Sequence, residues 1–251
     1  MIEVDLRGQL IPRHHSVLRA LQHIGTRIDQ SQWCLVGGMM VLIALAERGH
    51  VATRSSQTKD ADVLVDVCTV PDVLARVVHE LEKFGYNPIE EFGEGDFARF
   101  TFVSIGGGQI DVLCPEDTSL EELHSVPGIE SLAIPGGRRA LEVADSVRIT
   151  YDDLEQDVII RVPLLLGALV VKAAAAVDLA TAGQPRHIQD VVDMLIGMDD
   201  PEIERDEITE QDRSLLRSLS DRMTNDGDMA WDGLDAERRQ LARAAYELLV
   251  D

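Results

Sequence analysis

The sequence predicts an α+β protein, with a mixed sheet and flanking helices in residues 1–162 and a helical domain in residues 163–251. Short apolar and β-branched runs alternate with helical patterns as far as Pro163. After Pro163 only helical periodicity remains. The chain has 251 residues, of which 45% are hydrophobic, so it is long enough to bury one large core or two modest ones.

Residues before Pro163 predict helices and strands in alternation. Apolar residues three and four positions apart indicate helices, whereas short β-branched or alternating runs indicate strands. Two glycines separate the first strand from its following helix, and Gly106 to Gly108 predict a hairpin turn. The expected helices are 17–28, 39–46 and 70–84, and the expected strands are 33–36, 62–67, 100–105 and 109–113.

The remaining segments are a turn-rich region at 115–139, short strands within 140–161, and then helices. Thr209 and Asp235 are expected to cap the last two helices, because their side-chain oxygens can accept from free backbone N–H groups. The acidic segment 199–212 is interpreted as a solvated linker and helix start. The expected helices after Pro163 are 164–180, 188–196, 210–223 and 236–250.

The charge of the chain limits its partners. Its 23 basic and 45 acidic residues give a formal net charge of −22. A field of this sign repels polyanions, so broad nucleic-acid binding is not expected. An acidic surface suits a cationic substrate or a basic protein partner, and it also serves solubility alone.

Composition also indicates the compartment. No apolar run reaches the length of about 18 residues that a membrane span needs, and the first residues do not resemble a signal peptide. Three cysteines lie far apart without a CxxC pair, which argues against a zinc knuckle or a disulfide framework. We therefore expect a cytoplasmic protein with reduced thiols.

Two aspartates open an otherwise apolar strand. Asp60 and Asp62 project from the same face, because side chains alternate along a strand. Adjacent carboxylates repel each other, and a divalent cation is a common reason to bring them together. The alternative is that both are strand-entry residues in solvent.

A third aspartate, Asp111, lies in the later apolar strand QIDVL. If the two strands are neighbours, Asp111 can face the same site as Asp62. Three carboxylates can hold two magnesium ions, which act on both the attacking and the leaving oxygens of a phosphoryl transfer. The alternative is that Asp111 is a surface residue of a hairpin, far from Asp62.

The segment WCLVGGMM predicts a strand, two glycines and a helix. Gly37 and Gly38 permit a sharp turn and close approach of a ligand, and a helix start presents free N–H groups to phosphate. The same pattern is also typical of a simple tight turn.

These segments in the order VGGMM, TKDAD and QIDVL resemble the DNA polymerase β-like nucleotidyltransferase superfamily. The chain is most similar to the AbiEii-like toxin nucleotidyltransferases, over roughly residues 33–194. Their later helical segment, with a lysine, a basic residue and an aspartate, corresponds to Lys172, Arg186-His187 and Asp190, with Asp193 one turn on.

The resemblance implies Mg²⁺ or Mn²⁺ as cofactor and a nucleoside triphosphate as substrate. Asp60, Asp62 and Asp111 would bind metal, and Asp111 would help to deprotonate the acceptor hydroxyl. Lys172 would reach the phosphates, since a lysine inside an apolar helix either directs its ammonium to a partner or extends it to solvent. The implied nucleotide-binding residues are Gly37, Gly38, Arg54, Thr58 and Lys172.

Several interpretations stay open. Asp190 and His187 either orient Lys172 or close the cleft, or they are ordinary helix-surface residues. The acceptor is RNA, a protein or a small molecule, and a toxin of this kind has a cognate antitoxin. Met39 replaces the serine common after the glycines, and Arg54 lies further from the aspartates than the usual arginine. Both departures favour an alternative, a catalytically inactive binding or regulatory module with the same fold.

Overall fold

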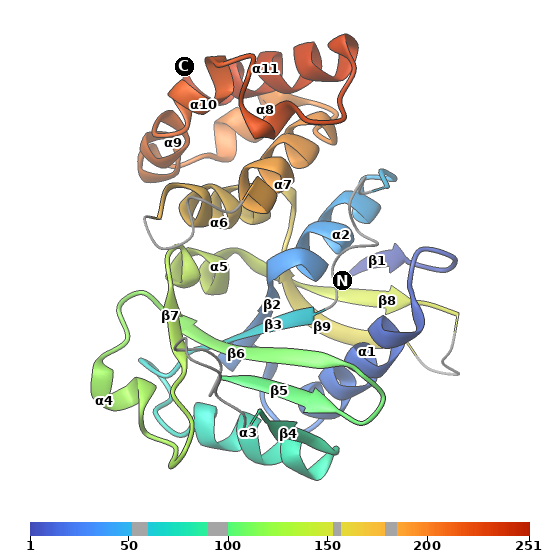
Figure 1. Ribbon diagram of the computed structural model, residues 1–251, viewed down its shortest axis with the longest axis vertical. Coiled ribbons are helices and arrows are strands. Elements are labelled where there is room, and N and C mark those ends of the chain that lie inside the picture. The colour runs from blue at the N-terminus through green and yellow to red at the C-terminus, as the bar shows by residue number, and fades with distance from the viewer. Residues whose placement is uncertain (52–59, 90–99, 153–156, 179–184) are drawn as a thin grey trace.

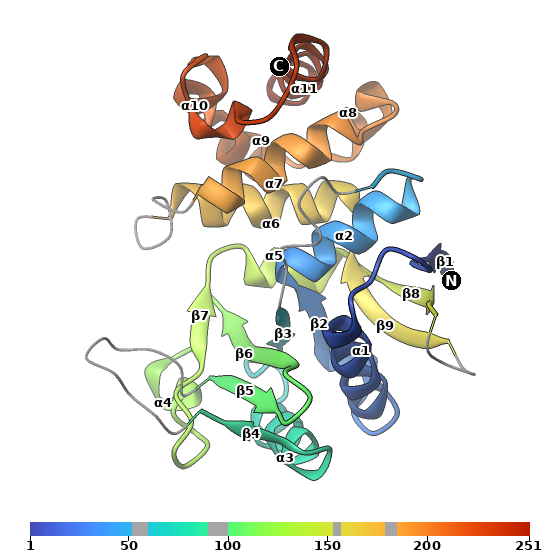
Figure 2. The same cartoon turned by 45° about the vertical axis from the view of Figure 1, so that its right-hand side comes forward.

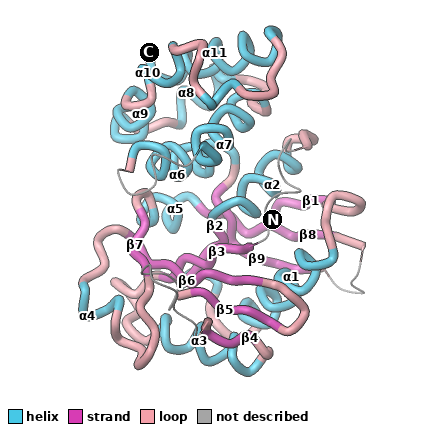
Figure 3. Tube along the Cα trace, viewed as in Figure 1, coloured by secondary structure: helices cyan, strands magenta, loops and turns pink. Residues whose placement is uncertain are grey.

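The structure of the protein is a computed structural model that describes residues 1–51, 60–89, 100–152, 157–178 and 185–251. It is an α+β protein, in which two β-sheets are flanked by helices and a set of helices follows the last strand (Figure 1). Figure 3 shows this division, with the strands gathered in the first part of the chain and helices in the remainder.

The larger sheet has six strands in the order β2-β3-β6-β5-β4, and β7 pairs with β6. β3 and β6 are parallel, whereas β2 pairs with β3 and β5 pairs with β6 in antiparallel fashion, so the sheet is mixed. β5 and β6 form the hairpin predicted around Gly106 to Gly108. The strands are β2 (Trp33–Val36), β3 (Asp60–Val65), β4 (Tyr86–Pro88), β5 (Thr101–Ser104), β6 (Gln109–Pro115) and β7 (Leu132–Ile134).

A second sheet has the order β1-β8-β9. β1 (Ile2–Asp5) runs parallel to β8 (Ala144–Thr150), and β9 (Val158–Pro163) is antiparallel to β8. The pair of β8 and β9 confirms short strands within 140–161. β1 was not predicted from the sequence, because four residues carry little periodicity of their own.

Five helices flank the sheets, and α2 occupies the central place among them. α2 contacts β3 on one side and α6 on the other, so it connects the larger sheet to the following helices (Figure 1). Its side chains from Met39 to Leu45 are all buried. The five helices are α1 (Pro12–Gly25), α2 (Gly37–Glu47), α3 (Val73–Lys83), α4 (Leu120–Leu123) and α5 (Gly137–Val143).

After β9, every described element is helical. Figure 2 shows α6 and α7 next to α2 and α5, with α8 to α11 beyond them. Buried apolar residues of α6 and α7 belong to the same continuous core as those of the sheets. These helices are α6 (Leu165–Val177), α7 (Pro185–Ile196), α8 (Pro201–Glu207), α9 (Glu210–Arg217), α10 (Ser220–Thr224) and α11 (Ala236–Val250).

The capping predictions for this region are confirmed. The side chain of Thr209 accepts a hydrogen bond from the backbone N–H of Asp212, and Asp235 accepts one from that of Arg238. The predicted helix 210–223 is divided in the structure, because α9 ends at Arg217 and α10 begins at Ser220.

Of the prediction for 199–212, the helix start is confirmed, because α9 begins at Glu210, but the solvated linker is wrong, because the segment also contains α8. Asp200 caps the helix by accepting from the N–H of Ile203, and Pro201 occupies the first helical position. Acidic residues in the first turn interact favourably with the positive end of the helix dipole. Glu204 is also buried in an ion pair with Arg48 (2.7 Å). Local acidity therefore favours this helix rather than preventing it. Among the helices of the described residues, none is both long and apolar enough to cross a bilayer.

Candidate functional site

Strand register brings two of the predicted aspartates together. In the parallel pair of β3 and β6, Asp62 lies directly opposite Asp111, and Asp60 lies opposite Gln109. The prediction that the two strands are neighbours is confirmed, and the alternative that placed Asp111 far from Asp62 is wrong. Thr101 of β5 is the partner of Asp111 on its other side. The site therefore forms across three adjacent strands of the larger sheet.

Gly37 packs directly against the side chain of Asp62. Val36 of β2 is paired with Asp62, so the next residue begins α2 immediately beside that carboxylate. Gly37 has φ +75°, and a Cβ atom on it would lie 1.6 Å from Oδ2 of Asp62. No other residue fits this position, because both the backbone conformation and the space require glycine.

The two glycines were predicted to lie between the strand and a helix that begins at Met39, but in the structure they form the first turn of that helix. α2 begins at Gly37, and no side chain caps this end. The first N–H groups of an α-helix lack intrahelical partners, and this helix begins directly beside Asp62. Met39 is buried, with 1% of its surface exposed, so its side chain belongs to the core. Arg54 and Thr58 lie outside the described residues.

The aspartates are held in an unfavourable electrostatic state. Burial, together with the neighbouring Asp111 and Asp60, raises the pKa of Asp62 to about 7, although Lys172 and Arg186 oppose the shift. Burial also raises the pKa of Asp111, although hydrogen bonds from Thr101 and Gln109 act in the opposite direction. The second of these bonds joins Nε2 of Gln109 to Oδ1 of Asp111 at 3.3 Å. Strongly shifted carboxylates of this kind are typical of functional sites.

Lys172 is buried in α6, with 5% of its surface exposed, so the alternative that it extends to solvent is wrong. Its Nζ lies 2.8 Å from Oδ2 of Asp190 on α7. Lys172 is nevertheless close enough to Asp62 to lower the pKa of that carboxyl. The ammonium therefore has a carboxylate partner in α7 and acts electrostatically on the aspartates of the sheet.

The first turn of α7 adds two residues to this region. Arg186 is exposed and helps to lower the pKa of Asp62 and of Asp111. His187 is buried, with 8% of its surface exposed, which contradicts its interpretation as an ordinary surface residue. Asp193, one turn beyond Asp190, is also buried.

Sequence reasoning did not single out Thr101 and Gln109 as site residues. Gln109 lies two positions before Asp111 on the same strand, so alternation could have placed it on the same face. Thr101 could not have been found in this way, because its place beside Asp111 depends on the register of β5 with β6.

The chemistry of the cluster suits a hard divalent cation. The candidate ligands are all carboxylate oxygens, which Mg²⁺ and Mn²⁺ prefer, and a cation would offset the repulsion that raises the pKa of Asp62. Gly37 leaves the space beside Asp62 that the carboxylate needs. Within the described ranges, no three acidic, histidine or cysteine side chains already converge on one metal position. Magnesium commonly takes only one or two protein carboxylates and completes its shell with water and phosphate.

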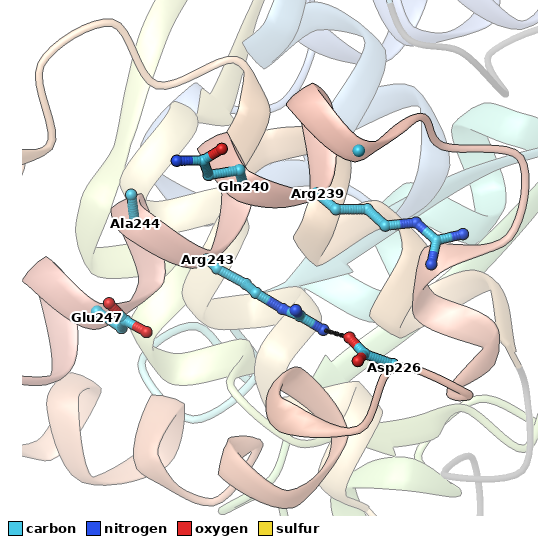
Figure 4. Close-up of a pocket in the computed structure, with 7 residues that line it drawn as sticks. Asp226, Arg239, Gln240, Arg243, Ala244 and Glu247 are labelled. Atoms are coloured by element: carbon cyan, nitrogen blue, oxygen red, sulfur yellow. Dashed lines mark hydrogen bonds and ion pairs between the residues drawn. The ribbon is translucent and has the colours of Figure 1, made fainter.

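A hollow on the C-terminal helices is a separate feature (Figure 4). Its two arginines already have partners. Arg243 is paired with Asp226 (2.5 Å) and stacks on Trp231, and Arg239 donates to the backbone carbonyls of Leu234 and Trp231. These contacts hold the loop before α11 in place, and we assign the hollow a structural role. It is lined by Asp226, Ala236, Arg239, Gln240, Arg243, Ala244 and Glu247.

Comparison with protein-family models and with curated protein sequences finds no match to this chain.

Proposed function

We propose that this protein is a metal-dependent nucleotidyltransferase with a nucleotidyltransferase-like fold. It moves a nucleoside monophosphate from a nucleoside triphosphate to an acceptor hydroxyl. The observation that carries the proposal is the direct opposition of Asp62 and Asp111 on parallel strands, with Gly37 fitted against Asp62. The resemblance to AbiEii-like enzymes in the GG, DxD and third-aspartate segments supplies the reaction class.

In this reaction the acceptor oxygen attacks the α-phosphorus, and the bond from that phosphorus to the bridging oxygen of the β-phosphate breaks. Pyrophosphate leaves with the bonding electrons, and Asp111 helps to take the proton of the acceptor hydroxyl. Gln109 and Thr101 hold Asp111 in orientation by donating hydrogen bonds to its carboxylate. Asp60 and Asp62 would hold Mg²⁺ or Mn²⁺, which supplies charge neutralisation for the carboxylates and the phosphates.

The cationic groups of the site belong to the helices. Lys172 and Arg186 act on Asp62 from α6 and α7, so a phosphate chain bound near Asp62 comes within their electrostatic influence. The free first turn of α2, beginning at Gly37, adds backbone N–H donors. Lys172 would then exchange its contact with Asp190, at least in part, for a phosphate oxygen.

The net charge of the chain indicates only the chemical class of the acceptor. With a formal net charge of −22, the chain favours a cationic small molecule or a basic protein surface over a long polyanion. The proposal includes an RNA end, bound locally, as a further acceptor. It also includes a role for this chain as the toxin of a toxin–antitoxin pair, with the cognate antitoxin as its partner. A second candidate is a nucleotide-binding module without turnover. Met39, whose side chain belongs to the core rather than to the site, favours that candidate.

Thermal unfolding tests the proposed nucleotide site without knowledge of the acceptor. The wild-type protein is heated with each of the four nucleoside triphosphates, with and without Mg²⁺ or Mn²⁺. A ligand at a hundredfold excess over its dissociation constant stabilises the folded state by about 2.7 kcal/mol. We expect a stabilisation that requires metal and that is lost in Asp62→Asn.

Asp145→Asn is the matched control, because Asp145 is an exposed aspartate on β8. This variant should respond to nucleotide as the wild type does. If no nucleotide stabilises the wild type, or if Asp62→Asn responds equally well, the proposal is wrong. If nucleotide does stabilise the wild type, release of pyrophosphate over time in the presence of an acceptor separates an enzyme from a binding module without turnover.

A further inference from the structure

The first turn of α7 lies one turn before the residue that Lys172 contacts. α7 begins at Pro185, and its next two residues are Arg186 and His187. It packs against α6, where Lys172 reaches Asp190 one turn further along α7. The beginning of a helix of this length carries a partial positive charge and free N–H groups. Arg186 and the start of α7 therefore lie about one turn from the contact between Lys172 and Asp190.

Lys172 and Arg186 act electrostatically on both His187 and Asp62. Both cations lower the pKa of Asp62, and both also lower that of His187. Electrostatic influence of this kind falls off over several ångströms, so the two cations lie within reach of both groups.

His187 is a buried polar group without a partner. Only 8% of its surface is exposed, and neither Nδ1 nor Nε2 has a hydrogen-bond partner among the described residues. Burial lowers its pKa to about 3, assisted by Lys172 and Arg186, so the ring is neutral at pH 7. A neutral imidazole offers one N–H donor and one acceptor nitrogen. Buried groups of this kind are almost always paired, so an unpaired one requires an explanation.

We propose that His187 binds the substrate by donating its ring N–H to an oxygen of the phosphate chain, between Lys172 and Arg186. The proposal deepens the proposed function and rests on it. The nearest carboxylate of α7, that of Asp190, already has Lys172 as its partner. The charged groups that act on the ring are both cations, so a phosphate oxygen is the partner that their field attracts. The ring is thereby a specificity element for the phosphate chain rather than for base or sugar.

Inorganic tripolyphosphate tests this inference, because it presents the phosphate chain alone. Its dissociation constant is measured by calorimetry with Mg²⁺ for the wild type, His187→Leu and His187→Gln. Leucine removes both ring nitrogens, whereas glutamine retains an N–H donor. We expect His187→Leu to bind roughly tenfold or more weakly, since a hydrogen bond to a charged group is lost, and His187→Gln to remain within about threefold.

If His187 had a structural role, stability and ligand affinity would fall together in His187→Leu. If the ring binds ligand instead, the unfolding temperature of His187→Leu without ligand should equal or exceed that of the wild type, because two unpaired polar atoms are removed from the interior. Stability and ligand affinity therefore change in opposite directions only if the ring binds ligand. His79→Leu, at an exposed histidine of α3, is the matched control and should change neither quantity.

Two results overturn the inference in distinguishable ways. If the wild type binds tripolyphosphate and nucleotide but His187→Leu binds both equally well, the role of His187 is wrong and the proposed function stands. If the wild type binds neither, the proposed function fails together with this inference. Should His187→Leu not fold, the ¹⁵N resonances of the wild-type imidazole decide, because ligand must shift one ring nitrogen. Unchanged resonances in the presence of saturating ligand also overturn the proposal.

Discussion

The two ends of the parallel pair β3 and β6 both carry aspartates, but they treat these residues in opposite ways. At the carboxyl end, Arg138 reaches Asp66 (2.9 Å) and Asp117 (3.0 Å). Thr69 adds a hydrogen bond of 2.6 Å to Asp66. The acidic residues there are neutralised by a neighbour that the fold supplies.

At the amino end, Asp62 and Asp111 face each other instead. Among the described residues, neither forms an ion pair at contact distance, and Lys172, which acts electrostatically on Asp62, is held by Asp190. The pKa of Asp117 is lowered by its hydrogen bonds with Arg138, whereas that of Asp62 is raised by burial. The same residue type is thus stabilised just beyond the carboxyl end of the strand pair and held unfavourably near its amino end.

This difference distinguishes a structural acidic cluster from a functional one. A cluster that contributes to stability has its countercharge in place, whereas one that awaits a ligand leaves the repulsion unresolved. Three substitutions test this contrast.

Gly37→Ala should have the largest effect, at the strained end. The new Cβ would lie 1.6 Å from Oδ2 of Asp62, and the residue would have to keep φ +75°. We expect a loss of about 4 kcal/mol or more in the free energy of unfolding, measured by urea denaturation, because backbone or carboxylate must move. Nucleotide-dependent stabilisation should disappear as well.

Gly49→Ala is the matched control for this substitution. Gly49 has φ +73°, and nothing lies within 4 Å of its Cβ position. Its cost should be only about 1 kcal/mol, from the left-handed backbone alone. Equal losses for the two variants would show that contact with Asp62 contributes nothing.

Asp62→Asn should have the second largest effect, and its sign depends on pH. The fold raises the pKa of Asp62 from 3.8 to about 7, so it favours the protonated acid. The stability that Asp62 contributes is complete below pH 3.8 and is lost as the pH rises through about 7. Without metal, the wild type should therefore lose about 3 kcal/mol relative to Asp62→Asn between pH 5 and pH 8, at roughly 1.4 kcal/mol for each of the two units between pH 5 and the folded pKa.

Urea denaturation of both proteins at these two pH values measures the difference, which should level off above pH 7. Asp145→Asn, on the exposed face of β8, should show no such dependence. A constant difference across the range would mean that Asp62 is ionised normally and that the amino end is not strained.

Arg138→Met should have the smallest effect of the three, and it acts on the satisfied end. Loss of the guanidinium leaves Asp66, whose side chain is 12% exposed, without its cation. We expect a loss of about 2 kcal/mol in urea denaturation, since the site is only partly buried. Nucleotide-dependent stabilisation should be unchanged, because Arg138 lies at the opposite end of the strands.

The exposed pair of Arg7 and Asp5 provides the control, and Arg7→Met should cost less than Arg138→Met. If Arg138→Met abolished nucleotide binding, the two ends would not be independent and the comparison would fail.

Local sequence determined many elements and none of their long-range partners. The strand at Trp33–Val36 and the helix at Ala236–Val250 were predicted with their observed bounds, because apolar periodicity is a local property. The division between a mixed α/β part and a helical part follows from the same periodicity. β1 and α8 were not predicted, since β1 is stabilised by pairing with distant β8 and α8 by a cap and a buried ion pair.

For the candidate site, sequence alone determined that Asp60 and Asp62 share a face of one strand, because alternation is fixed by the pleat. Only the tertiary structure decided that Asp111 lies opposite Asp62, since the register of β3 with β6 depends on packing. It also decided that Lys172 is paired with Asp190 and that His187 is enclosed without a hydrogen-bond partner in the described part of the chain. Charges and hydrogen bonds act through space, so the neighbours of a residue become known only when the chain is folded.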